Sequence, residues 1–122
     1  MITLTTPIAD AIVLELQVLE LQDFRENHEY EKNQTQAAIA SGDFVRASRS
    51  MHESMIWQYN QRFANNFTLE KLDSITGSLL VNVLSTVSNP RAADLAQQDA
   101  WKEQYKFCLK VQKMIARRAA QA

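Results

Sequence analysis

The sequence predicts an all-α fold, a four-helix and mostly up-down bundle with long first and last helices. Its apolar side chains recur at every third or fourth position, which is the period of one helix face. It contains only two glycines and two prolines, too few for the tight turns of a β-sandwich or barrel. Its 122 residues are close to the usual size of one domain. We therefore expect a single helical domain over 1–122, with helices near 7–40, 44–65, 69–88 and 90–119.

The first helix is predicted to begin at Thr6 and Pro7, because a threonine hydroxyl can cap a helix and proline lacks an amide proton that the first turn does not use. Two apolar rows form its buried stripe: Ile8, Ile12, Leu16 and Leu19, and Leu14, Val18 and Leu21. The stripe narrows after Phe24, yet no proline or glycine follows before Gly42. One continuous helix is the first interpretation, and a five-helix fold with this helix broken near 27–33 is the alternative.

The segment from Ser41 to Phe44 is predicted to be the turn into the second helix. Gly42 can adopt the left-handed conformation that ends many helices, and Asp43 can cap the next one. Apolar residues then recur at helical spacing: Phe44, Ala47, Met51, Met55, Tyr59 and Phe63. We expect this row to face the core.

Thr68 is predicted to cap the third helix, and Asn89 with Pro90 to open the fourth. The inner half of the third helix should carry Leu69, Leu72, Ile75, Leu79, Leu80, Val83, Leu84 and Val87. One side of the fourth should carry Leu95, Trp101, Tyr105, Cys108, Gln112 and Ile115. These rows complete the expected core.

Cysteine usage and hydropathy indicate where the protein resides. Cys108 is the single cysteine, which excludes an intramolecular disulfide and favours a reducing compartment. The N-terminal segment lacks the basic region of a signal peptide, and no stretch has the roughly eighteen uncharged apolar residues that span a bilayer. We expect a cytoplasmic protein that does not associate with membranes.

Residues suited to catalysis or metal binding are few. His28, Glu31 and His52 are the only material for a metal site, and neither histidine has the glutamate three residues earlier that a di-iron bundle requires. Cys108 falls on the apolar side of its helix, where a thiol is inert. No glycine-rich phosphate loop or dinucleotide motif occurs. We predict no enzyme activity, no metal and no cofactor.

Charge is segregated along the chain although the net charge is only -1. Residues 1–31 carry seven acidic side chains and Arg25, whereas residues 75–122 carry seven basic side chains and three acidic ones. In an up-down bundle the acidic end of the first helix and the basic end of the last should lie apart, so that they cannot neutralise each other. The alternative is that the basic residues near the C-terminus of the last helix stabilise that helix through its dipole.

A basic row occupies the last helix: Lys102, Lys106, Lys110, Lys113 and Arg117. At 100° per residue it falls within an arc of roughly 80°. This row could contact the phosphates of nucleic acid or an acidic partner. It could equally be a solvated face, since it contains no aromatic residue and Glu103 lies beside it.

Residues 74–90 carry no charged side chain, and the next charged residue is Arg91. A surface helix normally displays charges outward, so an uncharged outer face indicates that something covers it. The residues of this predicted self-association surface are Ser74, Ser78, Val81, Asn82 and Ser85. A second copy of the chain could cover them, or another helix of the same chain could do so.

Together these features favour a non-enzymatic protein-interaction or assembly protein that forms homo-oligomers. Small accessory proteins of bacteria and phages have this character. The alternative is a nucleic-acid-binding accessory module that uses the basic row. A helical bundle hosts many activities, so the fold alone does not choose between them.

Overall fold

The computed structural model describes residues 6–19 and 21–121, except for the side chains of 6, 17–19 and 22–29. They form five α-helices and a short 3₁₀ turn: α1 Thr6–Leu19, α2 Leu21–Ala40, α3 Phe44–Asn66, η1 Leu69–Lys71, α4 Leu72–Ser88 and α5 Leu95–Gln121. The described residues contain no strand, so the all-α prediction is confirmed. Two helices, α1 and α2, replace the single first helix of the four-helix prediction. Residue 20, between them, lies outside the described residues, and α2 runs unbroken across 27–33, where the five-helix alternative expected a break.

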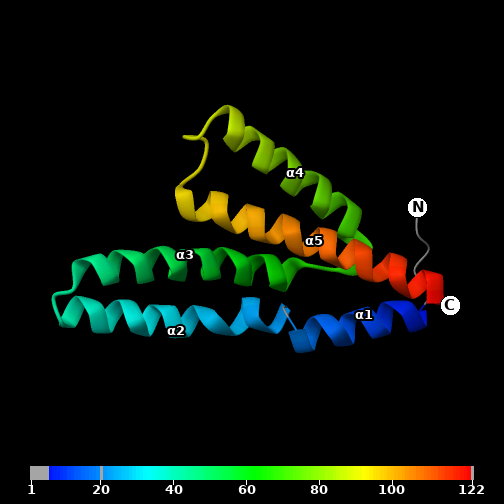
Figure 1. Cartoon of the computed structure of the whole chain (residues 1–122), viewed down its shortest axis with the longest axis horizontal. Coiled ribbons are helices and arrows are strands. Elements are labelled where there is room, and N and C mark those ends of the chain that lie inside the picture. The colour runs from blue at the N-terminus through cyan, green and yellow to red at the C-terminus, as the bar shows by residue number, and fades with distance from the viewer. Residues whose placement is uncertain (1–5, 20, 122) are drawn as a thin grey trace.

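The helices lie in an open row rather than a closed bundle (Figure 1). In that view α1 and α2 lie end to end along one side, α3 lies next to α2, and α5 lies on the other side of α3. The outermost helix, α4, packs on α5. The chain direction alternates between α2, α3, α4 and α5, as an up-down order requires. This arrangement leaves the outer side of α4 without a neighbouring helix.

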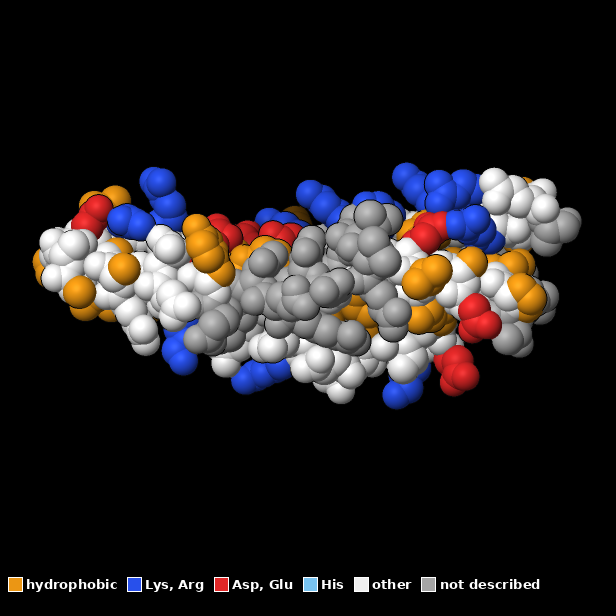
Figure 2. All heavy atoms as spheres, turned by 90° about the horizontal axis from the view of Figure 1, so that it is seen from below, with side chains coloured by type: hydrophobic (Ala, Val, Ile, Leu, Met, Phe, Trp, Pro, Cys, Tyr) orange, Lys and Arg blue, Asp and Glu red, His pale blue; other side chains and the backbone are white. Residues whose placement is uncertain are grey.

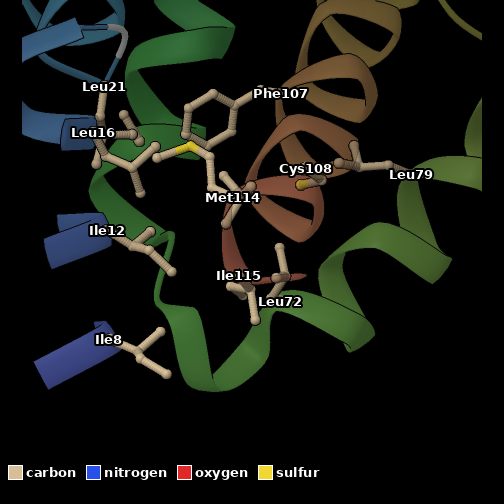
Figure 3. Packing of buried hydrophobic residues seen from close by; sticks show 12 residues of the cluster. Ile8, Ile12, Leu16, Leu21, Leu72, Leu79, Phe107, Cys108, Met114 and Ile115 are labelled. Atoms are coloured by element: carbon tan, nitrogen blue, oxygen red, sulfur yellow. The ribbon is translucent and has the colours of Figure 1, made fainter. Parts of the chain in front are cut away.

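The main core lies where α1, the end of α3, the start of α4 and the second half of α5 meet. Figure 3 shows aliphatic side chains from these helices pointing toward one another. The buried members of the cluster are Ile8, Ile12, Leu16, Leu21, Ala64, Leu72, Leu79, Phe107, Cys108, Val111, Met114 and Ile115. The ring of Phe107 meets two partly buried rings beside the cluster, Phe63 at a centroid distance of 5.7 Å and Phe67 at 5.3 Å. We call this region the core end.

At the opposite end, α2 and α3 continue as a two-helix hairpin beyond the first turn of α5 (Figure 1). The side chains buried there are small, namely Ala38 of α2 with Ala47 and Ser50 of α3. Arg46 Nη2 donates to Gln34 Oε1 at 2.7 Å across the same two helices. We call residues 30–52 the hairpin arm. Its helices are joined by small and polar contacts, so it buries little apolar surface.

The hairpin turn agrees with its prediction. Gly42 has φ +75°, which is the left-handed conformation, and Asp43 Oδ1 accepts a hydrogen bond from the Arg46 amide at 3.1 Å. Ser41 and Asp43 donate their amides to carbonyls of the last turn of α2, so that the helix end is satisfied.

The predicted start of the last helix at Asn89 and Pro90 is wrong. Asn89 Oδ1 accepts from the Arg91 amide at 3.2 Å, so this pair closes a local turn instead of capping a helix. Asp94 caps α5, because its Oδ1 accepts from the Gln97 amide at 2.7 Å. Thr68 precedes η1 and makes no side-chain cap, and α4 begins only at Leu72.

Two predicted core rows are only partly buried. On α3 the exposed fractions are 74% for Phe44, 53% for Met51 and 37% for Met55, so that row turns to solvent over the arm. On α4, Leu80, Leu84 and Val87 are exposed. Leu14 and Leu95 of the predicted rows are also exposed. The cause is the open row, because a helix with neighbours on one side buries about half of the arc that a closed bundle would cover.

Candidate interaction surfaces

The outer side of α4 carries exposed apolar residues and, over residues 74–90, no charged side chain. Leu80, Val81, Leu84 and Val87 are 39%, 62%, 55% and 73% exposed. Val81 and Leu84 lie on the side of the helix turned away from its buried residues, Leu72, Thr76, Leu79 and Thr86, whereas Leu80 and Val87 lie at the edge of that buried side. These four exposed residues, with the predicted Ser74, Ser78, Asn82 and Ser85, form what we call the α4 outer face.

The structure places the predicted self-association residues together. Ser74, Ser78, Val81 and Ser85 are exposed and Asn82 is half-buried. Most of them border a shallow, open depression lined by Asp73, Ser74, Gly77, Ser78, Val81 and Asn82. No other described helix covers this side, so the alternative in which the chain covers its own α4 is wrong.

The apolar half of the α4 outer face escaped sequence reasoning. Leu80, Leu84 and Val87 follow the helical period of the buried side, and this period predicts that they lie in the core. The usable signal was the number of apolar positions, because α4 carries more of them than one contact with α5 can bury.

The residues of the predicted basic row lie along one side of α5. Lys102, Lys106, Lys110, Lys113 and Arg117 are all exposed along α5. The row lies away from the side of α5 that carries the buried Gln104, Phe107 and Val111. Figure 2 shows several Lys and Arg side chains along one long edge of the molecule, the upper edge in that view.

Carboxylates near this row are held by groups on other helices. Glu103 Oε2 accepts a hydrogen bond from Asn60 Nδ2 at 2.8 Å, and Asp99 Oδ2 lies 3.0 Å from His52 Nε2. Both partners belong to α3. Each of the two acidic residues within α5 therefore contacts a residue of α3.

The predicted separation of acidic and basic ends is partly wrong. Glu15 of α1 forms ion pairs with Arg118 and, at 3.4 Å, with Arg117. This occurs because α1 packs against the last turns of α5. One carboxylate of the acidic segment thus neutralises the C-terminal end of the basic row.

A polar seam joins α3 to α5. Gln104 Nε2 donates to Asn60 Oδ1 at 2.9 Å, with Asn60 fully buried. Tyr59 donates its hydroxyl to Asp94 at 2.9 Å, and this hydrogen bond raises the pKa of Tyr59 above its ordinary value. These bonds satisfy buried polar groups and fix the register of α5 on α3.

The candidate catalytic and metal-binding residues do not come together among the described side chains. His28 lies outside the described side chains, Glu31 is half-buried on α2, and His52 contacts Asp99. No cluster of three His, Cys, Asp or Glu suited to a metal occurs in the described part of the chain. Cys108 is fully buried, and burial raises the pKa of its thiol to about 11, so it is protonated at neutral pH.

A second exposed apolar area lies on the hairpin arm. A shallow depression there is lined by Phe44, Val45, Ser48, Arg49 and His52. It differs from the α4 outer face because Arg46, Arg49 and Glu53 interrupt it. Such mixed surfaces are ordinary on soluble domains.

No known protein family, curated protein or solved structure matches the chain. No helix in the described ranges is both long and apolar enough to cross a membrane. The surfaces themselves are therefore the basis for proposing a function.

Proposed function

We propose that this protein is a non-enzymatic assembly protein that pairs with a second copy of itself through the α4 outer face. The observation that carries the proposal is that four exposed apolar side chains lie on a helix whose residues 74–90 include no charge. Contiguous apolar surface without interrupting charge is uncommon on monomers and is typical of contact sites.

The chemistry of the face supports a second copy as the occupant. In a two-fold symmetric contact each residue meets the same set of residues on the partner. A charge near the axis would meet its own like charge, and residues 74–90 have none; Asp73 borders the face only in the first turn of α4. Small residues, Ser74, Gly77, Ser78 and Ser85, let two helix backbones approach closely, while Val81 and Leu84 supply apolar area beside them.

The mass of the protein in solution tests the proposal. Light scattering coupled to size exclusion should give twice the chain mass of 13.9 kDa at micromolar concentration. Val81→Glu should give the monomer mass, because it would place two like charges within the contact. Val45→Glu is the matched control, since Val45 is also exposed but lies on the arm. A wild-type monomer at high concentration would overturn the proposal.

Cross-linking locates the contact on α4. Ser78→Cys should form an intermolecular disulfide with a copper-phenanthroline oxidant, whereas Ser48→Cys, an equally simple change on the arm, should not. Cys108 contributes no background, because its thiol is buried and protonated. Equal cross-linking of both variants would show random collision instead of a specific pair.

A further inference from the structure

The lysines of the basic row form a second surface that self-association does not use. Lys102, Lys106, Lys110 and Lys113 lie on α5, away from the α4 outer face. With a rise of about 1.5 Å per residue they extend over roughly 17 Å of one straight helix. A linear array of cations suits a linear array of anions.

From this geometry we infer that the lysine row binds the phosphate backbone of double-stranded nucleic acid, without base recognition. The sequence alone left Glu103 as an objection, because it lies beside the row. In the fold Glu103 is bound to Asn60 and Asp99 to His52, so both α5 carboxylates point to α3. Residues 99–117 of α5 carry five basic and two acidic side chains, so this stretch is cationic although the whole chain carries net charge -1.

The residue types distinguish nucleic acid from an acidic protein. Lysine is depleted at protein–protein interfaces, where arginine and aromatic residues dominate. The row has four lysines and no aromatic residue, and Trp101 and Tyr105 are half-buried on another side of α5. Lysine contacts phosphate as a point charge. The lack of a stacking side chain favours the paired backbone over a single strand, which usually stacks on aromatics.

The fold also argues against a lipid surface. A helix that binds in the membrane interface inserts its apolar face beneath the headgroups. The apolar face of α5 carries Phe107, Val111 and Ile115, which are buried in the core end. The helix cannot turn that face outward without unfolding the protein.

Fluorescence anisotropy with a labelled 20-base-pair duplex tests the inference on the full chain. Four lysine–phosphate contacts predict that the logarithm of affinity falls with the logarithm of salt at a slope near -3.6, or about 150-fold between 50 and 200 mM. The variant K102Q/K106Q/K110Q/K113Q should lose at least 100-fold in affinity at low salt. The control K32Q/K71Q, which removes exposed lysines elsewhere, should stay within about threefold.

The other possible results of this experiment also support or overturn nucleic-acid binding by the lysine row. If the quadruple variant does not fold by circular dichroism, K102Q/K106Q and K110Q/K113Q should each reduce the salt slope by about 1.8. Absence of duplex binding at 50 mM salt, or equal loss in K32Q/K71Q, overturns the inference. So does equally tight binding to polyglutamate or to vesicles of phosphatidylserine. The Val81→Glu monomer should retain duplex binding, which separates this inference from the proposed self-association.

Discussion

The core end and the hairpin arm are built from the same kind of element but are held by different forces. In the core end, large aliphatic and aromatic side chains from α1, α3, α4 and α5 interdigitate. In the arm, two helices meet through Ala38, Ala47 and Ser50, and Phe44 and Val45 remain exposed. Buried apolar area therefore concentrates at one end of the molecule. The comparison teaches that the core end determines global stability, whereas the arm depends on its turn and on local contacts.

Removing a large ring should have the greatest effect, and only at the core end. Phe107→Ala should lower the free energy of unfolding by about 3–5 kcal/mol, because it empties space between Phe63 and Phe67. Phe44→Ala removes the same atoms from the exposed arm and should cost less than about 0.5 kcal/mol. Urea denaturation of both variants measures the difference, and similar costs would contradict the comparison.

High pH should weaken the core end through Cys108. Burial raises the pKa of the folded thiol to about 11 from 9.0, so the unfolded chain ionises first as the pH rises above 9. Stability should fall between pH 9 and 11 by up to about 2–3 kcal/mol more in the wild type than in Cys108→Ala. Denaturation at a series of pH values measures this. Parallel pH profiles for the two proteins would show that the thiol has no such role.

Asn60 lies where α5 packs on α3. Substitutions of Asn60 test whether its buried hydrogen bonds stabilise this contact. Asn60→Ala leaves the buried Gln104 amide without its partner and should cost about 1–3 kcal/mol. The double variant Asn60→Leu with Gln104→Leu should cost less, because both buried polar groups are then replaced. A double variant that is less stable than Asn60→Ala would mean that the polar seam is indispensable.

Two glycine substitutions should have small effects of opposite sign. Gly42→Ala forces alanine into φ +75° and should cost about 1 kcal/mol, seen chiefly as lost amide-exchange protection in the arm. Gly77→Ala lies inside α4 with open space around the new methyl group in the single chain, so in the monomeric Val81→Glu background it should add about 0.5–1 kcal/mol. Loss of protection throughout the core end in Gly42→Ala would show that the arm is not independent.

Local chemistry made part of this fold predictable. The left-handed Gly42 and the Asp43 cap each depend on residues adjacent in sequence. The buried positions of α5 followed from its period, with Cys108 and Ile115 as examples. Such features need no knowledge of which helices become neighbours.

The parts that sequence missed depend on arrangement in space. Helical periodicity finds the apolar side of a helix, but it does not state whether a neighbour covers it. Met51 and Leu84 fit their rows and still face solvent, because Met51 lies in the arm, where α2 is the main neighbour of α3, and α4 is the outermost helix of the row. Asn89 and Pro90 satisfied the rule for a helix start, yet Gln98 donates to the Pro90 and Ala93 carbonyls and the connection runs on to Asp94.

The candidate surfaces, too, were predictable from the sequence only in part. The uncharged outer side of α4 and the five basic positions of α5 were readable from the sequence. The engagement of Glu103 with Asn60 and of Glu15 with Arg118 was not, because these partners are distant in sequence.

The docking of α1 on the end of α5 has a consequence for biosynthesis. Glu15 and Arg117 are 102 positions apart, so the first helix finds its place only after the ribosome has made nearly all of the last one. Until then a nascent chain can close the α2–α3 hairpin but exposes Ile12 and Leu16. We expect chaperones that recognise aliphatic segments to bind this stretch during translation and to release it when α5 emerges.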